Sequence, residues 1–171
     1  MSVILVQCGQ CGNQLGFSIL DALYSHLKPQ GQHSPYSDDM RAFFRPSDDS
    51  VEAGLGFFGQ SDYDHQNNST INPSKLIARA ICIDTEPKVV NNIYEKSCNK
   101  SHLGWEYNHE NVLYRHGGAG NNWALGYQMC SGDFLLAIIN AIIKEIKLSY
   151  INGNGPPLLL IVHSKCKPCV L

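Results

Sequence analysis

Three short segments of this sequence carry the residue types that a phosphate-binding site needs. Residues 9–14 read Gly-Gln-Cys-Gly-Asn-Gln, and residues 118–121 read Gly-Ala-Gly-Asn. Glycines permit positive φ and a close approach of backbone N–H groups to an anion, and the N-terminus of a following helix adds its dipole. The side chains of Gln10, Gln14 and Asn121 would supply neutral donors. We therefore interpret the two segments as parts of one polyphosphate cradle.

The third segment is acidic, with Asp-Thr-Glu at residues 84–86. Asp84 and Glu86 cannot bind phosphate directly, but they suit a hydrated Mg²⁺ that bridges carboxylate and phosphate, because this ion prefers oxygen ligands and keeps several waters. The sequence has no G-x-x-x-x-G-K-[ST] motif, so it is not a P-loop protein. Charge neutralisation would rest on backbone dipoles and the metal ion.

Each segment also has a purely structural interpretation. Glycine between a strand and a helix commonly serves tight packing, and acidic residues just before Pro87 are typical of a helix start. Both interpretations stay open for each segment taken alone.

The apolar pattern predicts which elements position these segments. Runs at residues 3–6, 76–83 and 158–162 predict buried strands, with another short strand at residues 43–44. Residues 108–116 are expected to be irregular. Three helices are predicted from apolar rows: the first ends at Pro29, the second starts at Pro87, and the third starts after Ser131 as N-cap. The rows are Leu15, Ile19, Ala22, Leu23 and Leu27; Val89, Val90, Ile93 and Tyr94; and Leu135, Ile138, Ile139, Ile142 and Ile146.

Strands that alternate with helices predict an α/β fold, an incomplete Rossmann-like parallel sheet with helices on both faces. Ligands of such sheets bind at the carboxyl ends of the strands. Residues 9–14 and 84–86 follow strands directly, so we expect them to share this edge with residues 118–121.

Composition bounds the class of protein. The 171 residues are 43% hydrophobic and 16% charged, with a net charge of -2. This is ordinary globular composition for one domain. A near-neutral charge argues against a nucleic-acid or membrane-surface binder, and no apolar run approaches the roughly 20 residues that span a bilayer. Without a signal-peptide pattern, an intracellular location with reduced thiols is expected.

The cysteines allow two other interpretations. Cys8 and Cys11 form a C-x-x-C pair between a strand and a helix, where a helix N-terminus would lower a thiol pKa in a redox protein. Together with the second pair, Cys166 and Cys169, they have the spacing of a zinc site. Against both, Cys8 follows a buried strand and about 155 residues separate the pairs, so buried structural cysteine is the simpler interpretation.

The literal residues add a resemblance. Residues 9–14, the Asp84-x-Glu86-Pro87 turn and residues 118–124 (Gly-Ala-Gly-Asn-Asn-Trp-Ala) resemble the tubulin superfamily in this order and at about these separations. Residues 83–90 are most similar to its delta branch, delta-tubulin, with the epsilon and gamma branches as close alternatives. The resemblance runs from residue 2 to about residue 164.

The resemblance implies a GTP-binding structural component of the microtubule cytoskeleton, with hydrolysis completed by a neighbouring subunit. For the delta branch it implies a role in centriole and basal-body organisation of the centrosome and cilium, with other tubulins or centriolar proteins as partners. It implies that Asp84 and Glu86 face Mg²⁺ through water. The residues implied to bind GTP or GDP are Gly9, Gln10, Cys11, Gln14, Gly118, Ala119, Gly120 and Asn121.

The family continues after its fourth strand into a GGGTGSG phosphate loop, whereas this chain reads on as residues 165–171. We therefore expect a truncated form, with residues 1–164 a partial nucleotide-binding domain, residues 30–75 a long insertion and residues 165–171 a divergent tail. Such a chain should bind GTP weakly or not at all and lack GTPase activity. An alternative is an interaction or inhibitory fragment that pairs with tubulins through an open strand edge, without nucleotide.

Overall fold

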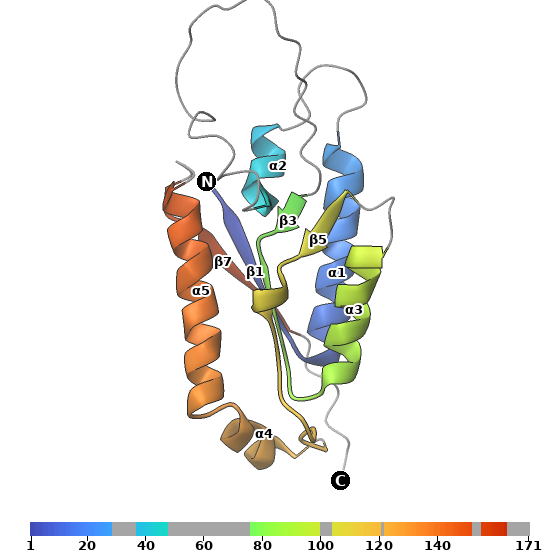
Figure 1. Ribbon diagram of the computed structural model, residues 1–171, viewed down its shortest axis with the longest axis vertical. Helices are drawn as coiled ribbons and strands as arrows, with labels where there is room; N and C mark the ends of the chain where they lie inside the picture. The colour runs from blue at the N-terminus through green and yellow to red at the C-terminus, as the bar shows by residue number, and fades with distance from the viewer. Residues whose placement is uncertain (29–36, 48–75, 100–103, 121, 152–154, 164–171) are drawn as a thin grey trace, which may run out of the picture.

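The computed structural model describes residues 1–28, 37–47, 76–99, 104–120, 122–151 and 155–163. It has three layers, with a parallel sheet between helices (Figure 1). Helices α1 (Gly9–Leu27) and α3 (Pro87–Asn99) lie on one face of the sheet, and α5 (Asp133–Ile151) lies on the other. This confirms the α/β fold predicted from the sequence. No described helix is both long enough and apolar enough to cross a lipid bilayer.

The main sheet has the order β6-β4-β1-β7, and all its pairings are parallel. Its strands are β1 (Val3–Cys8), β4 (Ala80–Asp84), β6 (Val112–Tyr114) and β7 (Leu158–His163). This order matches the first four strands of a doubly wound Rossmann sheet. The carboxyl ends of the strands therefore share one edge, which is the lower end of the molecule in Figure 1.

A smaller sheet contains the strand that leads directly into β4. Its strands are β2 (Phe44–Pro46), β3 (Leu76–Ala78) and β5 (Trp105–Tyr107), in the order β2-β3-β5. The prediction of one strand over residues 76–83 is wrong, because the run divides at Arg79. The Arg79 N–H donates to the carbonyl of Phe43 (2.8 Å), and its own carbonyl accepts from the Leu5 N–H (2.9 Å), so the chain changes sheets there.

Two further corrections concern short elements. Residues 108–116 are not irregular throughout, because the 3-10 turn η2 (His109–Asn111) leads directly into β6. Within the range 30–75, where only a strand at residues 43–44 was predicted, the structure describes helix α2 (Asp38–Phe43) followed by β2. The rest of that range lies outside the described residues.

The buried face of α1 differs from the predicted apolar row. Gly12, Asn13, Gly16 and Leu20 are buried, whereas Leu15 is 48% exposed. Ile19 and Leu27 do pack against the core. Small residues bring α1 close to the sheet, because a Cβ on Gly12 would clash with the Val162 carbonyl of β7.

The row predicted for α5 is also partly wrong. Ile138, Ile142 and Ile146 pack on the core cluster formed by β1 and β4, but Leu135 and Ile139 are exposed. Ser131 is not the N-cap, because its hydroxyl donates to the Gln128 carbonyl and α5 begins only at Asp133.

Buried polar residues tie α5 to the small sheet. Arg45 of β2 pairs with Glu145 of α5 at 3.3 Å, and both side chains are almost fully buried. Asn111 donates to the same Glu145 oxygen (2.9 Å) and to the Ala80 carbonyl (3.1 Å). Buried charges are tolerated when they are paired and hydrogen-bonded, so this cluster fixes how α5 sits on the sheet.

Candidate nucleotide site

The first candidate segment forms the junction between β1 and α1. Cys8 is the N-cap residue in extended conformation, and no side chain caps the helix. Gly9 has φ +72°, and a Cβ built there would meet nothing within 4 Å. The first N–H groups of a helix have no intrahelical partner, so this uncapped N-terminus suits an anion. Gln10, Cys11 and Gln14 are exposed around it.

Asn13 connects this junction to the next strand. Its Nδ2 donates to the carbonyl of Gly9 (2.9 Å) and to that of Ile83 (3.0 Å) near the end of β4. The side chain is fully buried. Asn13 thus holds the α1 N-terminus against the acidic turn. Sequence analysis assigned it no role, since a bond across 70 residues leaves no local signal.

The acidic turn presents one unpartnered oxygen. Asp84 Oδ1 accepts from the N–H groups of Thr85 (2.7 Å) and Glu86 (3.2 Å), whereas Oδ2 is buried without a hydrogen-bond partner. Burial raises the pKa of Asp84, the two backbone hydrogen bonds lower it, and the Glu86 charge raises it further. A carboxylate oxygen in this state suits a cation or a metal-bound water.

The glycine turn at residues 117–120 packs on the acidic turn. The Gly118 N–H donates to the Thr85 carbonyl (3.1 Å), and a Cβ on Gly118 would clash with the Glu86 carboxylate. Gly117, Gly118 and Gly120 all have positive φ, and beside Gly117 and Gly120 there is open space. Two candidate segments are therefore in direct contact, and Asn13 links the third to the end of β4.

For the remaining candidate residues the structure describes fewer contacts with the acidic turn. The Ala119 carbonyl accepts from the Asn122 N–H (2.9 Å), and Asn122 caps helix α4 (Trp123–Met129). Asn121 lies outside the described residues. No described hydrogen bond joins Gln10 or Cys11 to the acidic turn, so their part in a ligand site stays a prediction.

Sequence analysis also missed a cation at this edge. Arg115 directly follows β6, and its N–H donates to the Asp84 carbonyl (3.2 Å). Its guanidinium lies 5.3 Å from the centre of the Phe134 ring and donates to the Ser131 carbonyl (3.4 Å). Arg115 therefore joins β4 to the start of α5. Its position directly after a strand was the available signal.

The thiol interpretations gain no support from the described residues. Burial raises the pKa of Cys8, with smaller contributions from Cys130 and Asp84, whereas a redox nucleophile needs a lowered pKa. Cys166 and Cys169 lie outside the described residues. Within the described part of the chain, no group of three or more His, Cys, Asp or Glu side chains could hold a metal ion. Asp84 and Glu86 are a pair, which fits an ion held largely through water.

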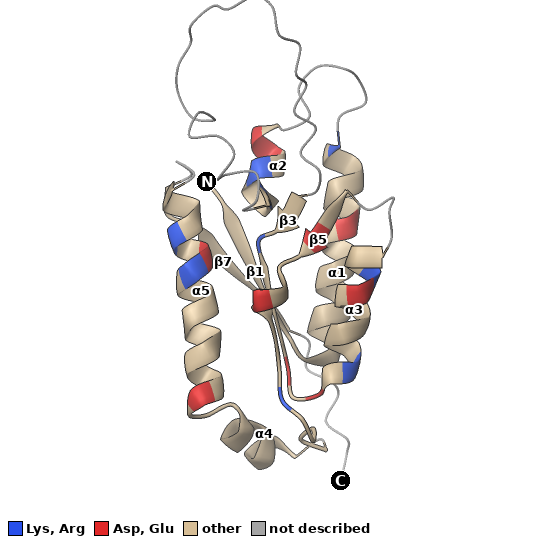
Figure 2. Cartoon of the chain, viewed as in Figure 1, with Lys and Arg blue, Asp and Glu red and all other residues tan. Residues whose placement is uncertain are grey.

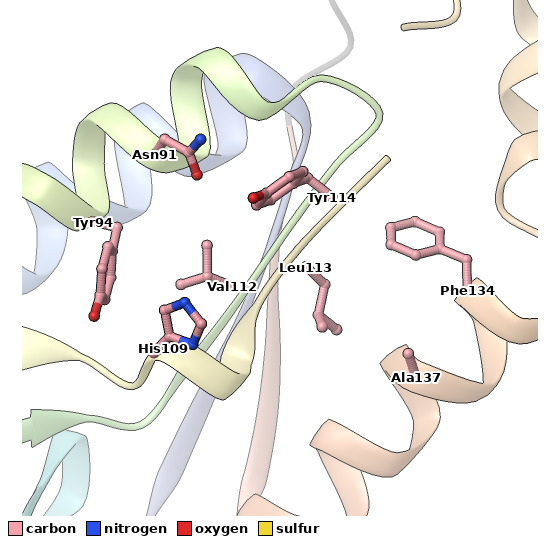
Figure 3. Close-up of a pocket in the computed structure, with 8 residues that line it drawn as sticks. All are labelled: Asn91, Tyr94, His109, Val112, Leu113, Tyr114, Phe134 and Ala137. Carbon is pink, nitrogen blue, oxygen red and sulfur yellow. The ribbon is translucent and has the colours of Figure 1, made fainter. Parts of the chain in front are cut away.

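A pocket lies away from the candidate site. It measures about 340 Å³ and opens at the β6 edge between α3 and α5, lined by Asn91, Tyr94, His109, Val112, Leu113, Tyr114, Phe134 and Ala137 (Figure 3). None of the candidate nucleotide residues lines it. The candidate site is thus an open surface at the carboxyl ends of the strands, built from turns and a helix N-terminus.

Comparison with known proteins agrees with this architecture. Residues 2–152 match the family model described as Tubulin/FtsZ family, GTPase domain. The chain is 36% identical over 148 residues to the tubulin delta chain of Canis lupus familiaris, and 32% identical over 147 residues to that of Homo sapiens. Each alignment covers 86% of this chain and 28% of the relative. The tubulin gamma chain of Caenorhabditis elegans is 32% identical over 168 residues, covering 95% of this chain and 31% of the relative. The chain thus spans less than a third of the length of these relatives.

Proposed function

This chain belongs to the Tubulin/FtsZ family, and we propose that its strand-end edge binds the phosphates of GTP or GDP with Mg²⁺. The observation that carries the proposal is the buried, unpartnered Oδ2 of Asp84 at the end of β4. At this strand end Asn13 of α1 bonds to the Ile83 carbonyl, and the Gly118 N–H bonds to the Thr85 carbonyl. The segment around Gly9 and the turn around Gly120 offer backbone N–H groups to phosphate. Asp84 and Glu86 would hold Mg²⁺ through water, and the ion would offset the charge repulsion between carboxylate and phosphate.

The donor set fits a metal–phosphate group. Gly9, Gly117 and Gly120 combine positive φ with open space at the position that a Cβ would take, which leaves room for a ligand near their backbone. Gln10, Cys11 and Gln14 are exposed at the same helix N-terminus and would add neutral contacts. Gly118 has a second role, since its missing side chain makes room for Glu86.

We propose weak binding for this chain. The site is open to solvent, and among the described residues its own charges are the two carboxylates, while the Arg115 guanidinium is directed to α5. Water competes for the backbone donors on an open surface, and phosphate binding depends on the metal ion. GTP hydrolysis by this chain is not proposed.

In the cell, we propose a structural role in the microtubule cytoskeleton at centrioles or basal bodies, with other tubulins or centriolar proteins as partners. Support comes from the family and from the delta-type relatives. The interaction-fragment alternative is favoured by a single feature, the open β7 edge with Leu158, Leu159, Leu160 and Ile161 all at least 44% exposed.

The test is titration of the chain with a fluorescent GTP analogue, with Mg²⁺ and with EDTA. We expect binding weaker than the low-micromolar range that depends on Mg²⁺ and is lost in Asp84→Asn. Asp21→Asn, a carboxylate change in the middle of α1, is the matched control and should retain it. Binding that is equal in EDTA, or equally reduced by both variants, would contradict the proposed site. Capture of tubulins without nucleotide, combined with no analogue binding, would favour the alternative.

A further inference from the structure

Helix α5 carries a second apolar row that the described chain leaves uncovered. Its core row packs on β1 and β4, with Phe134 and Ala141 buried and Ile138, Ile142 and Ile146 partly buried. The second row is exposed to solvent by 41% to 58%, and consists of Leu135, Leu136, Ile139, Ile143 and Tyr150. A surface helix normally has one apolar face, so a second apolar row indicates a second packing surface.

The ion pair of Lys144 shows which way the second row faces. Lys144 pairs with Glu110 of η2, so this flank of α5 points toward β6. At about 100° per residue, Leu135 lies about 180° from Lys144 around the helix and Ile139 about 140°. Leu135 and Ile139 therefore face away from β6, toward the β7 side of the sheet. Leu136 and Ile143, about 80° and 100° from Lys144, point more nearly to solvent.

Strand β7 presents apolar side chains on the same side. The register pairs Leu159 with Ile4 and Ile161 with Val6, and both β1 residues belong to the cluster under α5. Leu159 and Ile161 thus lie on the α5 face of the sheet, yet they are 44% and 67% exposed. Figure 2 shows no charged residue on β7. We call this surface, formed by the second row of α5 with Leu159 and Ile161, the α5/β7 shelf.

The α5/β7 shelf leaves room for one more helix on this face of the sheet. Neighbouring helices pack 8–10 Å apart, about the width of two strands, and α5 itself covers β4 and β1. The next helix position on this face lies over β7. A helix in this position needs apolar residues toward β7 and toward α5. The uncovered side of α5 has apolar residues of this kind, so a second α5 would meet both needs.

We propose that the shelf is the interface of a two-fold symmetric homodimer, in which α5 of each copy seats on the shelf of the other. Among the described helices, α5 alone has a row of exposed large apolar residues over several turns, so the shelf and its occupant are the same surface. Such self-complementarity is what a two-fold interface requires. Both α5 helices then lie side by side between two sheets, with Leu136 and Ile143 near Leu159 and Ile161 of the partner.

The available apolar area is comparable to that of a standard interface. With each half-exposed Leu or Ile offering roughly 50–60 Å², the shelf provides on the order of 400 Å² of apolar surface per copy. A standard interface buries roughly 800 Å² per partner, of which a little more than half is apolar. This dimer is a property of the chain beyond nucleotide binding, and its formation does not require a bound nucleotide.

The test is the molar mass of the full 171-residue chain by light scattering and sedimentation over a range of concentrations. We expect a concentration-dependent dimer. Ile143→Lys on α5 and Ile161→Lys on β7 should each raise the dissociation constant at least about tenfold, because each places a charge in the apolar centre. Leu15→Lys, an equally exposed leucine on the opposite face of the sheet, is the matched control and should leave it unchanged.

Circular dichroism and thermal melting establish that each variant is folded, which is expected because all three side chains are at least 42% exposed. A monomer at all concentrations would overturn the proposal and leave the shelf to another polypeptide. A dimer that Ile161→Lys does not weaken would also overturn it, since α5 would then not lie over β7. So would association that Leu15→Lys weakens as much as the other two changes.

Discussion

Asp84→Asn should stabilise the ligand-free protein at neutral pH while abolishing Mg²⁺-dependent nucleotide binding. In the ligand-free fold Oδ2 is buried without a partner, and burial raises the pKa of Asp84. The folded state therefore holds the proton more tightly than the unfolded chain does, and the ionised carboxylate opposes folding. Asparagine keeps the Oδ1 that accepts from Thr85 and Glu86, and removes the charge.

The magnitude follows from the local contacts. A buried unsatisfied polar group costs about 1–3 kcal/mol, and more when charged. Asparagine still leaves one polar atom there, and Asp84 is only partly buried, so solvent screens much of the charge. We expect a gain of about 1 kcal/mol, which raises the melting temperature by about 2–4 °C for a chain of this size.

The pH dependence gives the sharper check. Because the folded pKa is raised, the stability that Asp84 supplies is fully present below the unfolded pKa, about 3.9, and is lost as the pH rises through the folded pKa. The difference between variant and parent should thus be small in acid and grow toward neutral pH. Melting both proteins from pH 4 to pH 7 measures it, with Asp21→Asn as control. A variant less stable than the parent at pH 7, or a difference that does not change with pH, would refute the reasoning.

Two other changes test the packing that supports the site. Gly12→Ala should lower the free energy of unfolding in urea by about 1–3 kcal/mol, because the added methyl group meets the fixed Val162 carbonyl. Gln14→Ala changes an exposed side chain on the same helix and should lower it little. Equal losses in the two variants would contradict this reasoning. Glu145→Ala should cost about 3–5 kcal/mol in thermal unfolding, because it removes one partner of a buried ion pair with Arg45. Glu110→Ala breaks the exposed pair with Lys144 and should cost less than about 1 kcal/mol; a similar loss in both would show that burial of the pair does not matter.

The sequence predicted the main strands and the turns after them because their signals are local. The run at residues 3–6 and the glycines that follow identify β1 and the start of α1 without any distant contact. Strands β5 and β6 have three residues each and are defined by their pairing with β3 and β4. Three residues are too few for a period to be recognised, so these strands could not be predicted.

The faces of the helices were harder to predict than their positions. On α1 the residues nearest the sheet include Gly12, Asn13 and Gly16, which carry no hydrophobic signal. On α5 apolar residues occur on two sides, and the sequence does not say which side packs on the sheet. In both helices, contacts with the rest of the fold determine which face is buried on the sheet.

The candidate site shows the same contrast between local signals, which the sequence reveals, and long-range contacts, which it does not. Proximity of the acidic and glycine turns could be anticipated from the rule that strand ends share an edge. The contacts that hold the segments together are between side chain and backbone, such as Asn13 with Ile83 and Gly118 with Thr85. These depend on register, which spacing alone does not define.

We expect nucleotide binding and dimerisation to be coupled through β7. This strand supports the candidate site, although none of its residues is a candidate nucleotide ligand. The α1 N-terminus rests on β7 where Gly12 meets the Val162 carbonyl, and β7 is the strand that a second copy would cover. A partner that restrains β7 also restrains the uncapped N–H groups at Gly9, so the ordering cost of ligand binding falls. Affinity for the GTP analogue should therefore rise with chain concentration, and Ile143→Lys should weaken it although Ile143 is remote from the strand ends. Equal affinity for monomer and dimer would show that the two surfaces act independently.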